Sequence, residues 1–214
     1  MLRFPKRITA PLLAALLLAS CAVPPARPPV PDPETAWRTH RAALESVASF
    51  KLQGKLGVRT PKRGGQATLR WQRDNGSQTI DLYGPFSAGH LLLTEDANGA
   101  VLTSGKETRH AASAEQVLEE NTGWKVPFGA LRYWALGLPD PAASGVTRLD
   151  DHGRLGRLEQ HGWVVEYLDY QDSGALALPA RVFLKTRTEH PDDALPEEGR
   201  YDVEVRLVVK EWQL

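Results

Sequence analysis

Residues able to carry out covalent or acid–base chemistry are few in this 214-residue chain. The sequence has no GxSxG nucleophile elbow, no HExxH zinc helix and no dinucleotide-binding fingerprint. Six histidines are present, and none stands at a metal-ligand spacing from another His or Cys: His40, His90, His110, His152, His161 and His190. Residues 150–153 (Asp-Asp-His-Gly) could hold an acid–base pair, but this composition is more typical of a turn. We therefore expect no enzyme, no metal site and no cofactor.

The single cysteine, Cys21, is the one residue placed for covalent modification. Three basic residues precede a short apolar run at 8–19, too short to span a bilayer, which takes about 20 apolar residues. The four residues 18–21 (Leu-Ala-Ser-Cys) resemble the bacterial lipobox, in which the cysteine thiol is acylated and the chain is cut just before it. We predict that residues 1–20 are a lipoprotein signal peptide and that Cys21 is the lipid anchor. The alternative is an ordinary secretory signal with a chance cysteine.

Charge and cysteine content exclude further classes of protein. Removing Arg3, Lys6 and Arg7 leaves 26 − 3 = 23 basic residues against 26 acidic ones, a net charge of −3. This balance argues against a nucleic-acid binder and against electrostatic attachment to anionic lipid. A lone cysteine excludes an internal disulfide framework. Ala22 is the residue that follows the lipidated cysteine. In bacterial lipoproteins an Asp at this position commonly retains the protein at the inner membrane, so an Ala here indicates the outer membrane as the destination.

The elements that would position any site begin after a proline-rich tether. Residues 21–34 contain six prolines and favour extended polyproline II, and residues 35–214 suit a single domain. Pro33 suits the first turn of a helix, whose inward face we expect to carry Trp37, Arg41 and Leu44. Ser113 with Gln116 forms a capping box for a second helix, and a third runs from Pro127 to Gly137.

The rest of the domain alternates with a period of two. Such segments occur at 50–59, 67–72, 79–83, 91–94, 101–103, 155–160, 163–170, 180–186 and 201–209, separated by turn signals such as Asn75-Gly76. We count nine to eleven antiparallel strands and three helices, which favours one curved sheet with helices on its apolar face. Such a face is either filled by side chains or forms the wall of a ligand cavity. The sequence pattern does not distinguish these two alternatives. The residues we predict to line a cavity are Leu52, Leu56, Leu69, Trp71, Ile80 and Leu82.

Phe86 lies in the sequence Gly84-Pro-Phe-Ser-Ala-Gly89, at the expected tip of a hairpin. Loops run over the surface, so a phenylalanine here either folds back onto the core or contacts a membrane or a partner.

Several of these segments together resemble the LolB family of outer-membrane lipoprotein receptors. They include residues 54–58 (GKLGV), 69–72 (LRWQ), 84–86 (GPF), 122–127 (TGWKVP), 131–139 (LRYWALGLP), 160–163 (QHGW) and 210–212 (KEW). Each match is short, but their order and spacing extend over essentially the whole mature chain.

The resemblance implies a mainly β fold: an incomplete antiparallel barrel of about eleven strands, with about three helices covering an apolar cavity. It implies a monomer, anchored through acylated Cys21 and facing the periplasm, that accepts acylated lipoproteins from the carrier LolA and inserts them into the outer membrane without ATP. Phe86 takes the place of the protruding Leu of the family, and Ser87 the place of the following Gly. A structural lipoprotein that scaffolds an outer-membrane assembly without binding lipid is the alternative.

Overall fold

The computed structural model describes residues 28–60, 64–84, 89–122, 127–186 and 203–214. Cys21 and Phe86 lie outside these ranges. The helices are α1 (Pro33–Glu45), α2 (Ala114–Thr122) and α3 (Phe128–Leu136). The strands are β1 (Phe50–Arg59), β2 (Gly64–Asp74), β3 (Ser77–Gly84), β4 (Gly89–Asp96), β5 (Gly99–Ser104), β6 (Glu107–Ala111), β7 (Val146–Leu149), β8 (Leu155–Gln160), β9 (Trp163–Ser173), β10 (Leu176–Thr186) and β11 (Glu204–Gln213).

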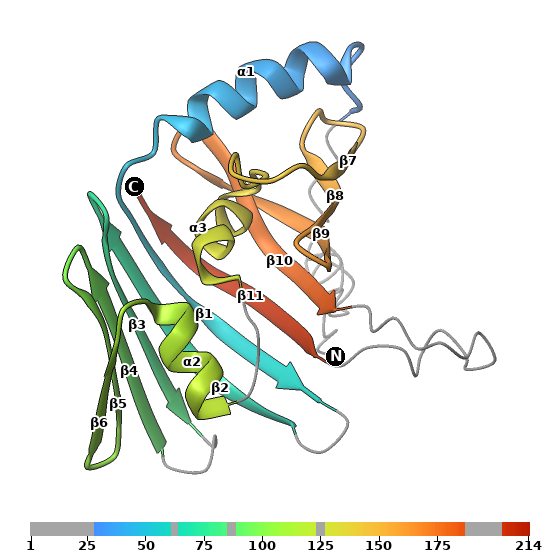
Figure 1. Ribbon diagram of the computed structural model, residues 1–214. Coiled ribbons are helices and arrows are strands. Elements are labelled where there is room, and N and C mark those ends of the chain that lie inside the picture. Colours follow the sequence, from blue (N-terminus) through green and yellow to red (C-terminus); the bar gives the residue numbers. More distant parts are fainter. Residues whose placement is uncertain (1–27, 61–63, 85–88, 123–126, 187–202) are drawn as a thin grey trace, which may run out of the picture.

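All eleven strands form one antiparallel sheet that bends around the helices (Figure 1). Its order is β6-β5-β4-β3-β2-β1-β11-β10-β9-β8-β7, so β6 and β7 are free edges and the barrel is incomplete. The strand early in the chain, β1, pairs with the last strand, β11, at the centre of the sheet. The predicted mainly β fold, with about eleven strands and three helices, is therefore confirmed.

Alternation of apolar and polar residues decides which face of each strand is buried. In β1, Phe50 and Leu52 are buried while Lys51 and Gln53 are exposed. Because side chains on a strand point alternately to the two faces, this pattern defines an inner face toward the helices and an outer face toward solvent. The tight turn between β2 and β3 uses Asn75-Gly76, whose φ angles of 42° and 98° suit a two-residue hairpin.

Local capping residues set the helix boundaries. Asp32 accepts a hydrogen bond from the Thr35 backbone N–H at 3.1 Å and begins α1. Ser113 accepts from the Gln116 backbone N–H at 3.2 Å and begins α2, as its capping box predicts. Gly137 ends α3 with a φ of 80°, a left-handed conformation that glycine adopts without strain. The helices lie over the inner face, α2 against β4, β5 and β6, and α1 and α3 against β10.

The antiparallel order gives the sheet two distinct ends. The β3–β4 connection, with Gly84 paired to Gly89, lies at what we call the hairpin end, together with the β1–β2 and β5–β6 connections. The turns β2–β3, β4–β5, β7–β8 and β9–β10 lie at the opposite end, which we call the α1 end.

Two elements differ from the expectation. β6 and β7 carry mostly exposed side chains, so they lack the alternation that marks the other strands. Arg41, expected on the inward face of α1, is exposed and pairs with Glu45 at 2.7 Å, whereas Trp37 and Leu44 are buried.

Candidate functional site

The six predicted cavity residues come together on the inner face of the sheet. Leu52 lies opposite Trp71 across β1 and β2, and Trp71 lies opposite Ile80 across β2 and β3. Leu69 faces Leu82 in the next row, and Leu56 faces Ala67 one row further. Directly opposed residues of antiparallel strands share a face, so these side chains form one continuous apolar surface. Their role as the lining of a cavity stays a prediction.

Burial along this surface decreases toward the hairpin end. Leu52 is 0% exposed, Leu69 4%, Trp71 5% and Ile80 8%. Leu56 and Leu82, nearer the hairpin end, are only partly buried. Other half-buried apolar residues lie at the same end of their strands: Val58, Leu91 and Val205. Among the six predicted residues, burial is therefore lower toward the hairpin end, while Leu184 and Leu207 remain buried at that end of β10 and β11.

Aromatic rings fill the interior near the α1 end. Phe50 packs edge-on against both Trp71 and Trp212, with ring centroids 5.4 Å apart in each case. The indole N–H of Trp71 donates to Gln78 Oε1 at 3.1 Å, and that of Trp212 donates to the Pro179 carbonyl at 3.0 Å. The buried indole groups thus keep hydrogen-bond partners, which removes the usual cost of burying them.

A buried polar network fixes α3 on the sheet. Gln160 Oε1 accepts from the indole N–H of Trp134 at 3.0 Å and from the Asp140 backbone N–H at 2.9 Å. Gln160 Nε2 donates to the carbonyls of Asp140 and Ala143. The hydroxyl of Tyr167 donates to the Trp134 carbonyl at 3.0 Å, and burial raises the pKa of Tyr167 well above its ordinary value. These bonds hold the helix that covers β10.

The junction between the N-terminal segment and the domain lies at the α1 end. The Val30 backbone N–H donates to the Asp151 carbonyl at 2.9 Å, in the β7–β8 turn. Gly153 in the same turn packs so closely that an added Cβ would lie 2.6 Å from the Pro33 carbonyl. Asp150 accepts from the guanidinium of Arg154 and from backbone N–H groups, which lower its pKa although burial opposes them. The turn interpretation of residues 150–153 therefore matches the structure.

Half-buried His40 on α1 faces this junction. Desolvation lowers its pKa, and the positive charge of Arg154 lowers it further. In the described part of the chain its Nε2 atom is buried without a hydrogen-bond partner. Burial therefore favours the neutral form of this histidine, while Asp150 opposes the shift.

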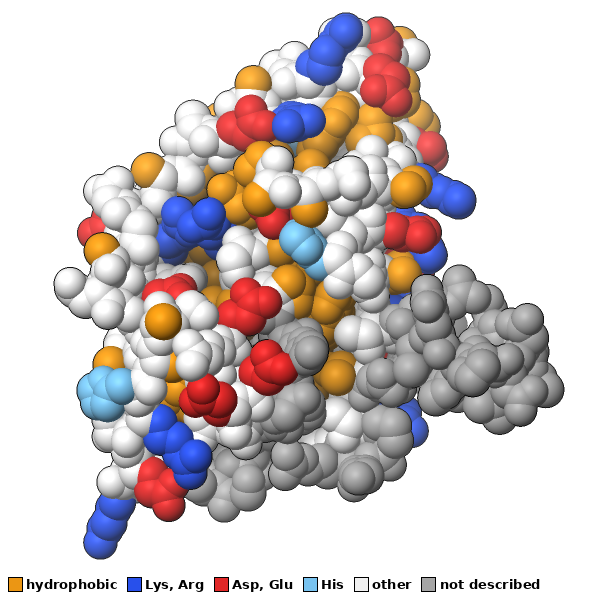
Figure 2. All heavy atoms as spheres, in the orientation of Figure 1, with side chains coloured by type: hydrophobic (Ala, Val, Ile, Leu, Met, Phe, Trp, Pro, Cys, Tyr) orange, Lys and Arg blue, Asp and Glu red, His pale blue; other side chains and the backbone are white. Residues whose placement is uncertain are grey.

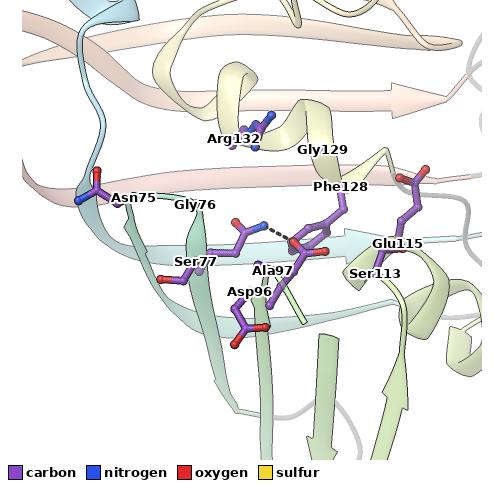
Figure 3. Close-up of a pocket in the computed structure, with 12 residues that line it drawn as sticks. Asn75, Gly76, Ser77, Asp96, Ala97, Ser113, Glu115, Phe128, Gly129 and Arg132 are labelled. Atoms are coloured by element: carbon purple, nitrogen blue, oxygen red, sulfur yellow. Dashed lines mark hydrogen bonds between the residues drawn. The ribbon is translucent and has the colours of Figure 1, made fainter. Parts of the chain in front are cut away.

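A separate pocket of about 560 Å³ opens at the α1 end, between the β2–β3 and β4–β5 turns and the helices α2 and α3 (Figure 3). Glu95, Asp96, Glu115 and Arg132 contribute charged groups to it, and Phe128 contributes an aromatic ring. None of the six predicted cavity residues lines this pocket. Its charged wall suits water or polar groups and is unfavourable for an alkyl chain.

Sequence reasoning missed Gln160 and His40. Gln160 is the last residue of a strand whose sequence predicts one buried face. Because it lies two residues after Leu158, its side chain is expected on the same, inward face. His40 lies three residues after Trp37, which is the spacing of one helix face. Both positions were therefore visible as inward-facing polar residues, but their partners come from distant segments.

The described side chains offer an apolar surface rather than reactive groups. Within the described ranges, no cluster of three or more His, Cys, Asp or Glu could hold a metal ion. No helix among the same residues is long and apolar enough to cross a membrane. On the face shown in Figure 2, apolar side chains are visible beneath α1 and around α3, with charged side chains both among them and at the edges.

An incomplete antiparallel barrel with helices over an apolar inner face is the fold of the LolA superfamily. The chain superposes on a LolA superfamily protein from Nitrosomonas europaea with a TM-score of 0.51 and 7% identity, covering 86% of this chain and 94% of that structure. At this identity the likeness concerns the fold alone.

The sequence defines the family more narrowly. Residues 48–212 match the family model described as "Outer membrane lipoprotein LolB", and the chain belongs to this family. It is 37% identical over 210 residues to the outer-membrane lipoprotein LolB of Pseudomonas putida, covering 96% of this chain and 94% of the relative. The LolB protein of Nitrosococcus oceani is also 37% identical, over 213 residues, covering 97% and 98%. Membership supports an outer-membrane lipoprotein with a role in lipoprotein localisation.

Proposed function

We propose that this protein is a lipid-anchored receptor that accepts lipoproteins from a LolA-type periplasmic carrier and inserts them into the inner leaflet of the outer membrane. Acylated Cys21 anchors it, the domain faces the periplasm as a monomer, and neither ATP nor a catalytic step is involved. The six inner-face residues predicted above hold the acyl chains during transfer.

The observation that carries this proposal is the decrease in burial along the inner face. Leu56 and Leu82 are less covered than Leu52 and Trp71, although all four belong to one apolar surface. An acyl chain entering at the hairpin end would therefore meet apolar side chains directly. It would need only to displace neighbouring side chains and helices as it moved inward.

The energetics require a continuous shelter for the acyl chains. A triacylated lipoprotein carries on the order of 45 methylenes, and at about 0.8 kcal/mol each, exposure to water would cost tens of kcal/mol. Transfer without ATP therefore proceeds from lower to higher affinity, from the carrier to this protein and then to the bilayer. The anchor at Cys21 raises the local concentration of the domain at the target membrane.

Phe86 is proposed to contact the bilayer during insertion. β3 and β4 remain paired up to Gly84 and Gly89, so the residues between them connect the two strands at the hairpin end. Leu82 and Leu91, which pair two positions before Gly84 and Gly89, are among the half-buried residues of the inner face. A bilayer contact at Phe86 would thus lie beside the less covered part of the apolar surface.

Acyl binding by the soluble form tests the proposal. A mature chain with Cys21→Ala should bind a fluorescent fatty acid saturably, and a triacylated lipopeptide should displace the probe. The core residues all lie between Trp37 and Trp212, so this variant keeps the folded interior. A folded Cys21→Ala protein that binds no acyl chain would remove the receptor proposal.

The scaffold alternative is favoured by one observation. Four of the six inner-face residues are less than 9% exposed, which is typical of an interior filled by side chains. A scaffold with a permanently filled interior would bind neither the fatty acid nor the lipopeptide. Competition between the two ligands for one site would support the receptor.

A further inference from the structure

A strip of basic side chains runs along the outer face of β1 and β2. Lys51, Lys55 and Arg59 alternate with the inner-face residues of β1, and Arg70 lies on the outer face of β2. β1 contains no acidic residue, and the one in β2 is Asp74 at the α1 end. The whole chain has 26 basic and 26 acidic residues, so the positive charge of these two strands is a local excess.

One row of this outer face lies at the base of the β3–β4 connection. Lys55, Thr68, Tyr83 and His90 are neighbours in register across four strands. Lys55 Nζ donates to Thr68 Oγ1 at 2.7 Å, and the Tyr83 ring stacks on His90 with centroids 4.7 Å apart. The guanidinium of Arg70 lies 5.2 Å from the centre of the Tyr83 ring, and Tyr83 is 37% exposed. Cations and an exposed aromatic ring therefore meet at the hairpin end.

Nearby acidic groups are already engaged. Asp81 on β3 lies directly opposite Arg70 and 2.6 Å from His90, and Glu204 on β11 lies directly opposite Arg59 and 3.9 Å from Arg206. These two carboxylates offset part of the positive charge, and Lys55 and Lys51 have no acidic residue opposite them on β2 or β11. In the described part of the chain, Lys55, Arg59 and Arg70 form no salt bridge. The net charge of the whole chain hides this local excess of positive charge.

The position of the tether determines which surface can reach the bilayer. The hydrogen bond from Val30 to Asp151 holds the start of the domain at the α1 end, opposite the β3–β4 connection. Residues 21–29 can extend at most about 30 Å. The ten residues of β1 extend about 33 Å, so the fully extended tether is slightly shorter than the sheet. For the hairpin end to touch the bilayer that holds the anchor, the strands must incline, which brings one side of the domain to the surface.

We propose that this side is the outer face at the hairpin end, and that Lys55, Arg59, Arg70 and Tyr83 form a contact site for anionic phospholipid headgroups. Cations near an anionic surface are attracted to it, and tyrosine favours the membrane–water interface. The proposal rests on the proposed bilayer insertion and adds the surface that orients the domain for it.

Vesicle binding by the Cys21→Ala chain tests this site without the contribution of the anchor. The double variant Lys55→Gln/Arg70→Gln should bind vesicles of phosphatidylglycerol and phosphatidylcholine about 25-fold less tightly at low salt, at about fivefold per cation. Binding to pure phosphatidylcholine should not change. Tyr83→Ser should weaken binding to both kinds of vesicle.

A matched control is Lys51→Gln/Lys210→Gln, which removes two exposed cations away from the hairpin end. It should change binding to anionic vesicles less than twofold. Equal losses in the two double variants, or no loss in either, would overturn the site. Reduced lipoprotein transfer from the carrier in solution, with unchanged vesicle binding, would also overturn it by identifying the strip as a protein-docking surface. Acyl-probe binding is a separate readout, so failure of this site and failure of the receptor proposal remain distinguishable.

Discussion

Gln160 on β8 and Trp134 on α3 are joined by a buried hydrogen bond of 3.0 Å. Gln160→Ala would leave the indole N–H of Trp134 and the backbone N–H of Asp140 without an acceptor. We expect this to lower the free energy of unfolding by about 3 kcal/mol, measured by urea denaturation. Gln72→Ala, at an exposed position on the outer face of β2, should change it by less than about 0.5 kcal/mol. Similar values for the two variants would contradict the role given to the network.

His40 should make stability depend on pH. Its pKa is lowered in the folded protein from an ordinary value of 6.5, so below that value the unfolded chain takes up a proton that the folded chain resists. The free energy of unfolding should therefore fall as pH decreases from about 7 to about 5. His40→Gln should flatten this slope in denaturation curves measured across the interval. An unchanged slope would show that other groups cause it.

Leu82 offers a way to block the interior at its less covered end. Leu82→Trp should lower the affinity for a fluorescent fatty acid about tenfold, because the larger ring occupies space that the alkyl chain needs. Leu92→Trp places the same ring on the outer face of the adjacent strand, where Leu92 pairs with Asp81. That control should bind the probe normally, and an equal loss there would contradict the proposed path.

Phe86 should matter for insertion and not for binding. With Phe86→Glu we expect the protein to bind fatty acid normally but to deliver lipoprotein to vesicles poorly, because a carboxylate resists entry into the hydrocarbon region. Phe86→Leu, which restores the residue common in the family, should keep full delivery. Normal delivery by the Glu variant would refute a role for this residue in membrane contact.

Gly153 should be intolerant of a side chain. Its φ is +69°, and an added Cβ would lie 2.6 Å from both Ala36 Cβ and the Pro33 carbonyl. Gly153→Ala should cost about 3 kcal/mol in thermal or urea unfolding, from backbone strain together with the clash. Gly174→Ala is the comparison, since its φ is +60° and nothing lies within 4 Å of the added atom. It should cost about 1 kcal/mol.

Local patterns predicted much of the fold. Ser113 and Gln116 marked the start of α2, Gly137 marked the end of α3, and alternation in β1 separated Leu52 from Lys51. The two edge strands were missed because β6 and β7 bury little on either face, which leaves no periodic signal. A strand at the edge of a sheet forms through hydrogen bonds to its single neighbouring strand. Its own residue types do not reveal that pairing.

The candidate site was predictable in part. Periodicity placed the six apolar residues on one face, and the observed register agrees with that placement. The difference in burial between Leu52 and Leu82 was not predictable, because it depends on where the helices cross the sheet. The outer basic strip was hidden by the balanced charge of the chain, and only strand parity reveals that Lys55, Arg59 and Arg70 share a surface.

The pairing of β1 with β11 has a consequence for how the chain matures. Leu56 lies opposite Leu207, so the middle of the sheet joins two segments from opposite ends of the domain. Closing so large a loop is slow, and one edge of β1 stays without its neighbour until β11 is available. A polypeptide threaded across a membrane from its N-terminus therefore remains open until nearly its whole length has crossed. The central pair of the sheet, β1 with β11, can therefore form only after the C-terminal strand is present.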